Sequence, residues 1–246
     1  MRIALLSDIH GNREALEAVL ADAAARDIGR CVILGDIVGY GPDPAWCVQR
    51  IQEMEAAGAL VIRGNHDAAI AGSARDMNAT ARASIDWTRP RLSAAQTGWL
   101  AALPLTIREE DRLYTHASAH SPGDWIYVTS DRDAMASFRS SDAGVIFCGH
   151  VHVPALYSSD IHDRIQAHAE RPRIPVPLLA SRRWLVVAGS VGQPRDGSPQ
   201  AGWAIFDTAT RELSFRRTPY DTAVTAGKIQ AAGLPEELAL RLRSGE

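Results

Sequence analysis

The sequence predicts an α/β fold built around parallel strands, on the evidence of alternating apolar runs and helical patterns. Residues 2–7, 31–34 and 59–62 are apolar almost throughout, as expected for strands buried on both faces. Between them, residues 12–29 and 45–57 carry apolar side chains at helical spacing. A β-α-β-α-β order predicts right-handed crossovers and ligands that gather beyond the carboxyl ends of the strands.

The rest of the chain is expected to add further strands and helices to this unit. Helical spacing predicts two or three helices in residues 68–103. The later predicted elements are a hairpin of 105–107 and 112–115, a helix at 132–140, strands at 143–148 and 153–158, strands with antiparallel spacing at 184–188, 203–207 and 212–217, and two amphipathic helices after residue 220. Residues 117–131 and 160–177 are predicted loop excursions from a single domain that spans residues 1–246.

Composition excludes several classes of protein. The formal net charge is −3 and no Lys/Arg block occurs, which argues against general nucleic-acid binding. The three cysteines lack CxxC spacing, so neither a disulfide framework nor a thiolate zinc site is indicated. The N-terminal apolar run is too short for a signal peptide or a membrane span. We therefore expect a cytoplasmic protein without membrane contact.

Polar residues with oxygen or nitrogen donors follow the apolar runs. They are Asp8, His10, Asp36, Asn65, His116, His150 and His152. Asp8 and His10 are two positions apart and are expected to share one face of an extended segment, as are His150 and His152. This donor set is too large for one ion and suits two ions, with Asp36 predicted as the bridging carboxylate.

A two-metal site of this kind predicts hydrolysis of phosphoesters. Two divalent cations about 3.5–4 Å apart can hold a bridging hydroxide and clamp an in-line displacement. Nitrogen and oxygen donors without thiolate favour transition metals, here Mn first, with Fe, Zn, Ni or Co as alternatives. His66 is expected to point away from Asn65 and to act on the leaving oxygen. Asp67 is expected to orient the His66 ring and to hold it charged.

At these residues the sequence resembles the calcineurin-like metallophosphoesterase superfamily. The matching motifs are Asp8-Ile9-His10, Gly35-Asp36, Gly64-Asn65-His66-Asp67, His116 and Gly149-His150-Val151-His152. They span residues 1–155 in the order of the family signature. The later segment 189–195 is similar to compact bacterial and archaeal members.

The resemblance implies a four-layer αββα sandwich of two mixed sheets flanked by helices (α/β, or α+β in some schemes). The metal site would lie at the C-terminal edge of the strands. The implied ligands are Asp8, His10, Asp36 and His152 for one metal, and Asp36, Asn65, His116 and His150 for the other. It also implies that His66 acts on the leaving group.

Other residues are candidate contacts for a small phosphoester substrate. They are Tyr40, Arg63, His120 and Arg195. For the two arginines the alternative is a structural salt bridge, and for His120 it is a solvated loop position. Trp125 and Tyr127 could stack on a nucleoside or an aromatic leaving group. The alternative is that they pack the loop onto the body of the protein.

The function favoured by these observations is hydrolysis of a phosphodiester, possibly a nucleotide, by a metal-bridging hydroxide. Alternatives within the class are phosphomonoester hydrolysis, on protein or on small molecules, and hydrolysis of dinucleoside polyphosphates. A non-catalytic scaffold on the same fold would be expected to lack ligands or His66, and all of these are present. Self-association into a homo-oligomer stays open.

Overall fold

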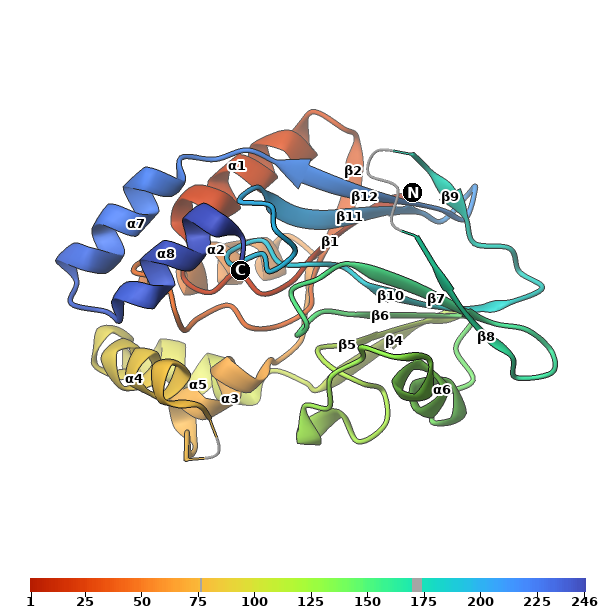
Figure 1. Cartoon of the computed structure of the whole chain (residues 1–246), viewed down its shortest axis with the longest axis horizontal. Helices are drawn as coiled ribbons and strands as arrows, with labels where there is room; N and C mark the ends of the chain where they lie inside the picture. The colour runs from red at the N-terminus through yellow and green to blue at the C-terminus, as the bar shows by residue number, and fades with distance from the viewer. Residues whose placement is uncertain (76, 170–173) are drawn as a thin grey trace.

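The computed structural model describes residues 1–75, 77–169 and 174–246. Within these residues, two mixed six-stranded sheets pack face to face, and helices cover their outer faces (Figure 1). This confirms the predicted αββα architecture.

The first sheet has the strand order β3-β2-β1-β11-β12-β9. Its strands are β1 (Arg2–Leu6), β2 (Ile28–Ile33), β3 (Leu60–Val61), β9 (Val176–Pro177), β11 (Ala201–Asp207) and β12 (Glu212–Thr218). The strands β1, β2 and β3 run parallel, as their helical crossovers predict, and β11 joins β1 in the antiparallel direction.

The second sheet has the order β4-β5-β6-β10-β7-β8. Its strands are β4 (Thr106–Glu109), β5 (Arg112–Thr115), β6 (Val145–Cys148), β7 (Ala155–Ser159), β8 (Ile165–His168) and β10 (Arg183–Val187). The predicted hairpin is present as β4 and β5, and β5, β6 and β10 run parallel.

Eight α-helices and two short 3-10 helices lie in the described residues. They are α1 (Arg13–Ala24), α2 (Pro44–Ala56), α3 (Asn65–Ala71), α4 (Ala79–Thr88), α5 (Ala94–Ala102), α6 (Asp131–Arg139), α7 (Thr222–Ala231) and α8 (Glu236–Ser244), with η1 (Arg89–Arg91) and η2 (Pro122–Asp124). The α6 helix covers the second sheet, and α7 and α8 lie at the opposite end of the molecule from β8 (Figure 1).

Alternation along the strands explains the layers. On β1, Ile3 and Leu5 belong to the core between the two sheets, where they join Phe147. Ala4 and Leu6, on the other face, pack with α1 and α2. Successive side chains of a strand point to opposite faces, so a strand that is apolar throughout contributes to two cores.

Two sequence expectations are corrected. The segment at 184–188 was expected to neighbour 203–207 and 212–217, but β10 lies in the other sheet, between β6 and β7. Spacing along the chain does not reveal that a strand has changed sheets. The predicted excursion at 160–177 contains β8 and β9, and its residues 170–173 lie outside the described residues.

The parallel strands bring their carboxyl ends together. The loop after β1 is tied to the loop after β2 because the Asp8 N–H donates to the Gly35 carbonyl at 3.1 Å. The loop after β10 joins them, since the Val191 N–H donates to the Ser7 carbonyl at 2.9 Å. In the described part of the chain, no helix is long and apolar enough to cross a membrane.

Candidate metal centre

The loops that carry the candidate ligands have an unusual backbone. Five of these residues have a left-handed conformation, with φ of 55° at Asp8, 51° at His10, 53° at Asp36, 67° at His150 and 64° at His152. Few residues other than glycine adopt positive φ, and those that do are concentrated at functional sites. The expected extended segments are therefore wrong. Asp8 and His10 still share one group of candidate ligands, whereas His150 and His152 lie in different groups.

Tertiary hydrogen bonds hold these left-handed residues in place. The His10 N–H donates to the Asp36 carbonyl at 2.9 Å. The His150 N–H donates to Asp8 Oδ2 at 3.0 Å, which links the loop after β6 to the loop after β1. Because each loop is fixed by its neighbour, the strained conformations belong to a single interlocked unit.

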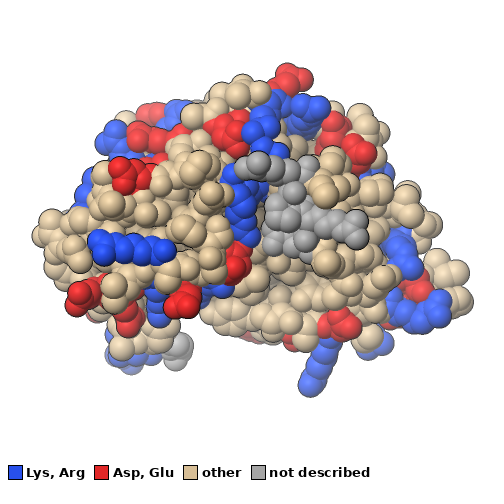
Figure 2. Space-filling view, turned by 45° about the horizontal axis from the view of Figure 1, so that its top comes forward, with Lys and Arg blue, Asp and Glu red and all other residues tan. Residues whose placement is uncertain are grey.

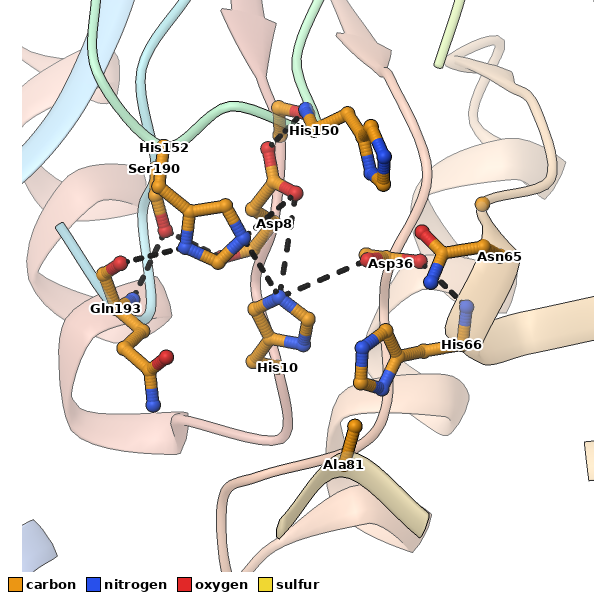
Figure 3. A network of polar contacts seen from close by, with 12 residues as sticks. Asp8, His10, Asp36, Asn65, His66, Ala81, His150, His152, Ser190 and Gln193 are labelled. Atoms are coloured by element: carbon orange, nitrogen blue, oxygen red, sulfur yellow. Dashed lines mark hydrogen bonds and ion pairs between the residues drawn. The ribbon is translucent and has the colours of Figure 1, made fainter. Parts of the chain in front are cut away.

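Three sets of side chains in the described residues could each hold a metal ion. The first group is Asp8, His10 and His152, the second group is Asp36, His116 and His150, and a third set, His10, Asp36 and His66, overlaps both. Within each, the ligand atoms lie within 4.8 Å of one another. Figure 3 shows Asp36 placed between His10 on one side and Asn65 on the other.

Asp36 connects the two groups. Its Oδ2 lies 3.6 Å from His10 Nε2 and 3.4 Å from His116 Nε2. Asn65 Oδ1 lies 3.1 Å from His116 Nε2, so the amide oxygen adjoins the second group. His10 Nε2 and His152 Nε2 are 3.2 Å apart in the first.

Hydrogen bonds at the opposite ring nitrogens suit the imidazoles to metal binding. His10 Nδ1 lies 3.1 Å from the Val38 carbonyl, and His116 Nδ1 lies 2.7 Å from the Leu34 carbonyl. His152 Nδ1 lies 2.6 Å from the Gln193 carbonyl. A carbonyl oxygen can only accept, so each Nδ1 carries a proton, which leaves Nε2 as the nitrogen that can bind a metal ion once it is unprotonated.

Burial and charge give the cluster an anionic, electron-donating character. Burial would raise the pKa of Asp36, but the His116 and His66 imidazoles hold it well below its usual range. Burial lowers the pKa of His150 to about 3, and its buried Nε2 has no hydrogen-bond partner among the described residues. For His116, burial opposes protonation, but the Asp36 carboxylate raises its pKa to about 9. Ionised carboxylates beside an unpartnered imidazole nitrogen fit a divalent cation.

Comparison with known proteins identifies the family of the chain. Residues 1–211 match the model of the calcineurin-like phosphoesterase superfamily domain. The chain belongs to the calcineurin-like phosphoesterase superfamily. An uncharacterised protein of Methanocaldococcus jannaschii is 35% identical over 249 residues, covering 99% of this chain and 98% of that protein.

Solved structures of similar proteins extend over the whole chain. A metallophosphoesterase from Sphaerobacter thermophilus is 37% identical, with a TM-score of 0.89 and 100% of both chains covered. A hypothetical protein from Pyrococcus horikoshii OT3 is 22% identical, with a TM-score of 0.81, 100% of this chain and 98% of that chain covered. The second similarity shows the fold alone. As a member of this superfamily the chain belongs to a family of metal-dependent hydrolases.

His66 lies beside the cluster, on a helix where an extended segment was expected. Asn65 is the first residue of α3, which corrects the expected alternation of Asn65 and His66. The His66 ring nevertheless lies 4.8 Å from the His10 ring and 4.5 Å from the Tyr40 ring, measured between centroids. Burial lowers its pKa to about 4, so the ring is neutral near pH 7 and not charged as expected.

Asp67 supports the backbone of the site. Its Oδ1 accepts from the Ile37 N–H at 2.9 Å, and its Oδ2 accepts from the Gly64 N–H at 3.0 Å. Successive residues of a helix point about 100° apart, which explains why these contacts replace the expected one with the His66 ring. Burial and the Asp36 carboxylate raise the Asp67 pKa to about 7.

Glycines allow the loops to approach one another. A Cβ atom at Gly149 would lie 1.7 Å from Ser7 Oγ and 2.6 Å from Asp8 Oδ2. Gly39 has φ of 85°, and a Cβ there would lie 2.2 Å from His66 Nδ1. The motif glycines therefore leave room for the cluster itself.

The predicted substrate contacts separate into two groups. Tyr40 and Arg195 adjoin the cluster, since the Tyr40 ring lies 4.5 Å from the His10 ring and the Arg195 guanidinium lies 5.7 Å from the Tyr40 ring. Arg63 instead donates to the Ala101 carbonyl at 2.6 Å, at the end of α5. His120 Nδ1 lies 3.1 Å from Ser140 Oγ, beside α6. The structure thus brings two of these four residues to the cluster.

Several supporting groups could not be found from sequence motifs. The carbonyls of Leu34, Val38 and Gln193 orient three imidazoles, and a backbone carbonyl leaves no mark on residue type. Asn12 donates to the Gly192 carbonyl at 2.8 Å and its Oδ1 caps α1. The position of Asn12 directly after Gly11 predicts a helix start but not the contact with Gly192.

Proposed function

We propose that this chain is a phosphodiesterase that uses two divalent transition-metal ions. The observation that carries the proposal is the position of Asp36 between the two groups of ligands, 3.6 Å from His10 Nε2 and 3.4 Å from His116 Nε2. One ion would be held by Asp8, His10, Asp36 and His152, and the other by Asp36, Asn65, His116 and His150. A carboxylate has two oxygens and can serve both ions.

The bound ions would supply Lewis-acid polarisation of the phosphoryl oxygens and a water of lowered pKa. The donors described above are imidazole, carboxylate and amide, with no thiolate among them, which favours Mn, with Fe, Zn, Ni or Co as alternatives. The Nδ1 hydrogen bonds of His10, His116 and His152 would hold their rings ready for coordination without rearrangement.

One of the chain's own residues, His66, would act on the leaving oxygen. His66 adjoins the first group and has a buried Nδ1 without a hydrogen-bond partner in the described structure. As a neutral imidazole it can donate an N–H hydrogen bond to the leaving oxygen as negative charge develops there. Asp67 would keep this region rigid through the backbone of the loop after β2.

Arg195 is the candidate for binding a phosphate oxygen. Its guanidinium donates to Gln193 Oε1 at 3.0 Å, and no carboxylate of the described residues forms an ion pair with it. A half-buried cation without an anionic partner has a favourable site for one. We therefore assign Arg195 to the phosphate and do not extend this role to Arg63 or His120.

The mixed charge of one face of the molecule gives no support to a polymeric substrate there. On the face shown in Figure 2, Lys and Arg side chains are interspersed with Asp and Glu side chains. A long polyanion would be favoured by a continuous basic surface. We therefore propose a small phosphodiester, such as a nucleotide, with a phosphomonoester as the runner-up.

Metal-resolved activity tests this proposal. The protein would be stripped of metal, reloaded in turn with Mn, Ni, Co, Zn or Mg, and assayed on bis(p-nitrophenyl) phosphate and on p-nitrophenyl phosphate. The proposal predicts faster turnover of the diester with a transition metal. Monoester preference would replace the diester assignment, and no turnover with two bound metals would indicate a non-catalytic scaffold.

A further inference from the structure

The loop between β5 and α6 places two aromatic side chains, Trp125 and Tyr127, beside the metal-binding cluster, and its backbone is strained at Ser121 and Trp125. Ser121 and Trp125 flank η2 and have φ of 53° and 54°. A left-handed conformation is an outlier for a bulky residue such as tryptophan and persists only when the surroundings enforce it.

Two anchors hold this loop against the body of the protein. The Ser118 N–H donates to the Ile126 carbonyl at 3.0 Å. Val128 is buried in the core under α6, together with Ala119. Tyr127 lies between these anchors, so its position is fixed on both sides.

The two aromatic rings lie against imidazoles of the same group of ligands. The Tyr127 ring stacks on His150 with centroids 4.1 Å apart and an interplanar angle of 22°. The Trp125 ring meets His116 edge-on at 5.9 Å and 71°. Both aromatic side chains therefore border the Asp36, His116 and His150 group.

Tyr127 retains a large exposed surface in spite of this stack. One face of its ring is covered by His150, and the side chain as a whole is 51% exposed. An aromatic residue that served only to attach the loop would be expected to lose most of its surface. Tyr127 instead presents a flat apolar surface next to the ligands.

The cation of the site is Arg195, which lies beside Tyr40. The Arg195 guanidinium is half-buried, 5.7 Å from the Tyr40 ring. Burial raises the pKa of the Tyr127 phenol, and the positive charge of Arg195 opposes that shift. A positive charge for phosphate and a flat ring for stacking are thus present together.

We infer that Tyr127 and Trp125 form an aromatic platform that binds a planar ring of the substrate, so that the substrate is a phosphate ester of a nucleoside or a similar aromatic group. The inference rests on the proposed function and adds to it the side chains that would bind the planar ring of the ester. Stacking on aromatic side chains tolerates any base, because every base has a π face.

The test compares two ligands that differ only in the base. Adenosine 5′-monophosphate and ribose 5-phosphate would be titrated into the manganese-loaded protein by calorimetry, with phenyl phosphate as a third ligand. The platform predicts that the nucleotide binds roughly 5- to 150-fold more tightly than ribose 5-phosphate. Tight binding of phenyl phosphate as well would assign the platform to aromatic rings in general, and a preference for the nucleotide would assign it to nucleosides.

Variants of the loop show which side chain causes the difference in affinity between the nucleotide and ribose 5-phosphate. Tyr127→Leu is expected to bring the ratio of the two affinities towards one while the affinity for ribose 5-phosphate stays unchanged. Tyr127→Phe keeps the ring and is expected to keep the ratio. Ile126→Ala, an exposed neighbour in the same loop, is the control. Metal content is measured for each variant because Tyr127 touches His150.

Distinct outcomes overturn the platform and the proposed function. Equal affinities of the wild-type protein for both ligands would overturn the platform, as would an unchanged ratio in both Tyr127→Leu and Trp125→Leu. Either result leaves the hydrolase proposal in place, because ribose 5-phosphate reports the phosphate contact by itself. Failure of ribose 5-phosphate and inorganic phosphate to bind the manganese-loaded protein would overturn both. If Tyr127→Leu loses metal, its affinities no longer test the platform. The ratio of the two affinities in the wild-type protein and in Trp125→Leu then tests it.

Discussion

Asp36 Oδ2 and His116 Nε2 lie 3.4 Å apart, although the two residues come from different sheets. The same oxygen is 3.6 Å from His10 Nε2 in the other group of ligands. The carboxylate thus lies between the two sheets, where the loop after β2 of the first sheet meets the loop after β5 of the second. A carboxylate in this position can couple the two ions that the two groups of ligands would hold.

Replacement of Asp36 by Ala is therefore expected to lower occupancy of both metal sites together. Removing a shared carboxylate deprives each ion of a ligand, whereas loss of an unshared ligand would affect one ion. Metal content per chain measured by mass spectrometry checks this, with Asp142→Ala, at an exposed surface position, as the control. Retention of two metals in the Asp36 variant would remove the bridging assignment.

Replacement of His66 by Ala is expected to reduce turnover of a phosphodiester by roughly 10²–10⁴-fold. The predicted reason is loss of the hydrogen bond to the leaving oxygen, so metal content should stay near that of the wild-type protein. Steady-state kinetics and metal analysis on the same sample provide the check. Because His66 also lies within 4.8 Å of His10 and Asp36 ligand atoms, a drop in metal content would instead assign it as a ligand.

Gly149→Ala is expected to disrupt the metal centre from the backbone. The added Cβ would lie 1.7 Å from Ser7 Oγ and 2.6 Å from Asp8 Oδ2, so the loop after β6 must move away from β1. Overpacking of this kind costs about 1–3 kcal/mol.

Gly227→Ala is the matched control for this substitution. A Cβ at Gly227, inside α7, meets nothing within 4 Å, and alanine favours a helix by up to about 1 kcal/mol. The midpoint of thermal unfolding and the metal content are measured for both variants. Both quantities are expected to fall in Gly149→Ala and not in Gly227→Ala. Equal effects of the two substitutions would show that Gly149 is not required for close approach.

The sequence predicted the strands and ligands that depend on local pattern. Residues 3–6 are apolar throughout because β1 contributes to two cores, and this local property is visible in the chain. The left-handed conformation of Asp8 and His10 is not local, since it depends on hydrogen bonds between loops that are distant in sequence.

Contacts between side chains of distant loops were also beyond prediction. Tyr127 was interpreted as either a stacking residue or a loop anchor, and only the structure shows its ring on His150 with much of its surface exposed. Similarly, residue spacing could not show that β10 lies in the second sheet while β11 lies in the first. Both depend on how the two sheets pack.

A polar cluster outside the metal centre gives a prediction about stability and pH. Glu14, at the start of α1, pairs with Lys228 of α7 and accepts from Thr225 Oγ1 at 2.8 Å. Burial raises the pKa of Glu14, but the hydrogen bonds from Lys228 and Thr225 outweigh it and lower the pKa below its ordinary value of 4.5. A carboxyl with a lowered folded-state pKa stabilises the protein above its unfolded-state pKa and loses this effect as the pH falls through the folded-state value.

Glu14→Gln is therefore expected to lower the free energy of unfolding by about 1 kcal/mol at pH 7. The difference from the wild-type protein should shrink as the pH falls below 4.5, where the wild-type carboxyl takes up its proton. Urea unfolding at a series of pH values measures the loss of unfolding free energy at pH 7 and its decrease at lower pH. The replacement Glu17→Gln, in an exposed pair with Arg13 on the same helix, should show little change at any pH. A pH-independent deficit in the Glu14 variant would rule out the ionic contribution.

The measurement closest to the central claim is a titration of metal-free protein with Mn²⁺, in which bound metal and turnover of bis(p-nitrophenyl) phosphate are followed in the same sample. Two ions that share Asp36 predict turnover that rises with occupancy and reaches its plateau at about two bound ions per chain. Full turnover with a single bound ion, or two bound ions without any turnover, would contradict the account.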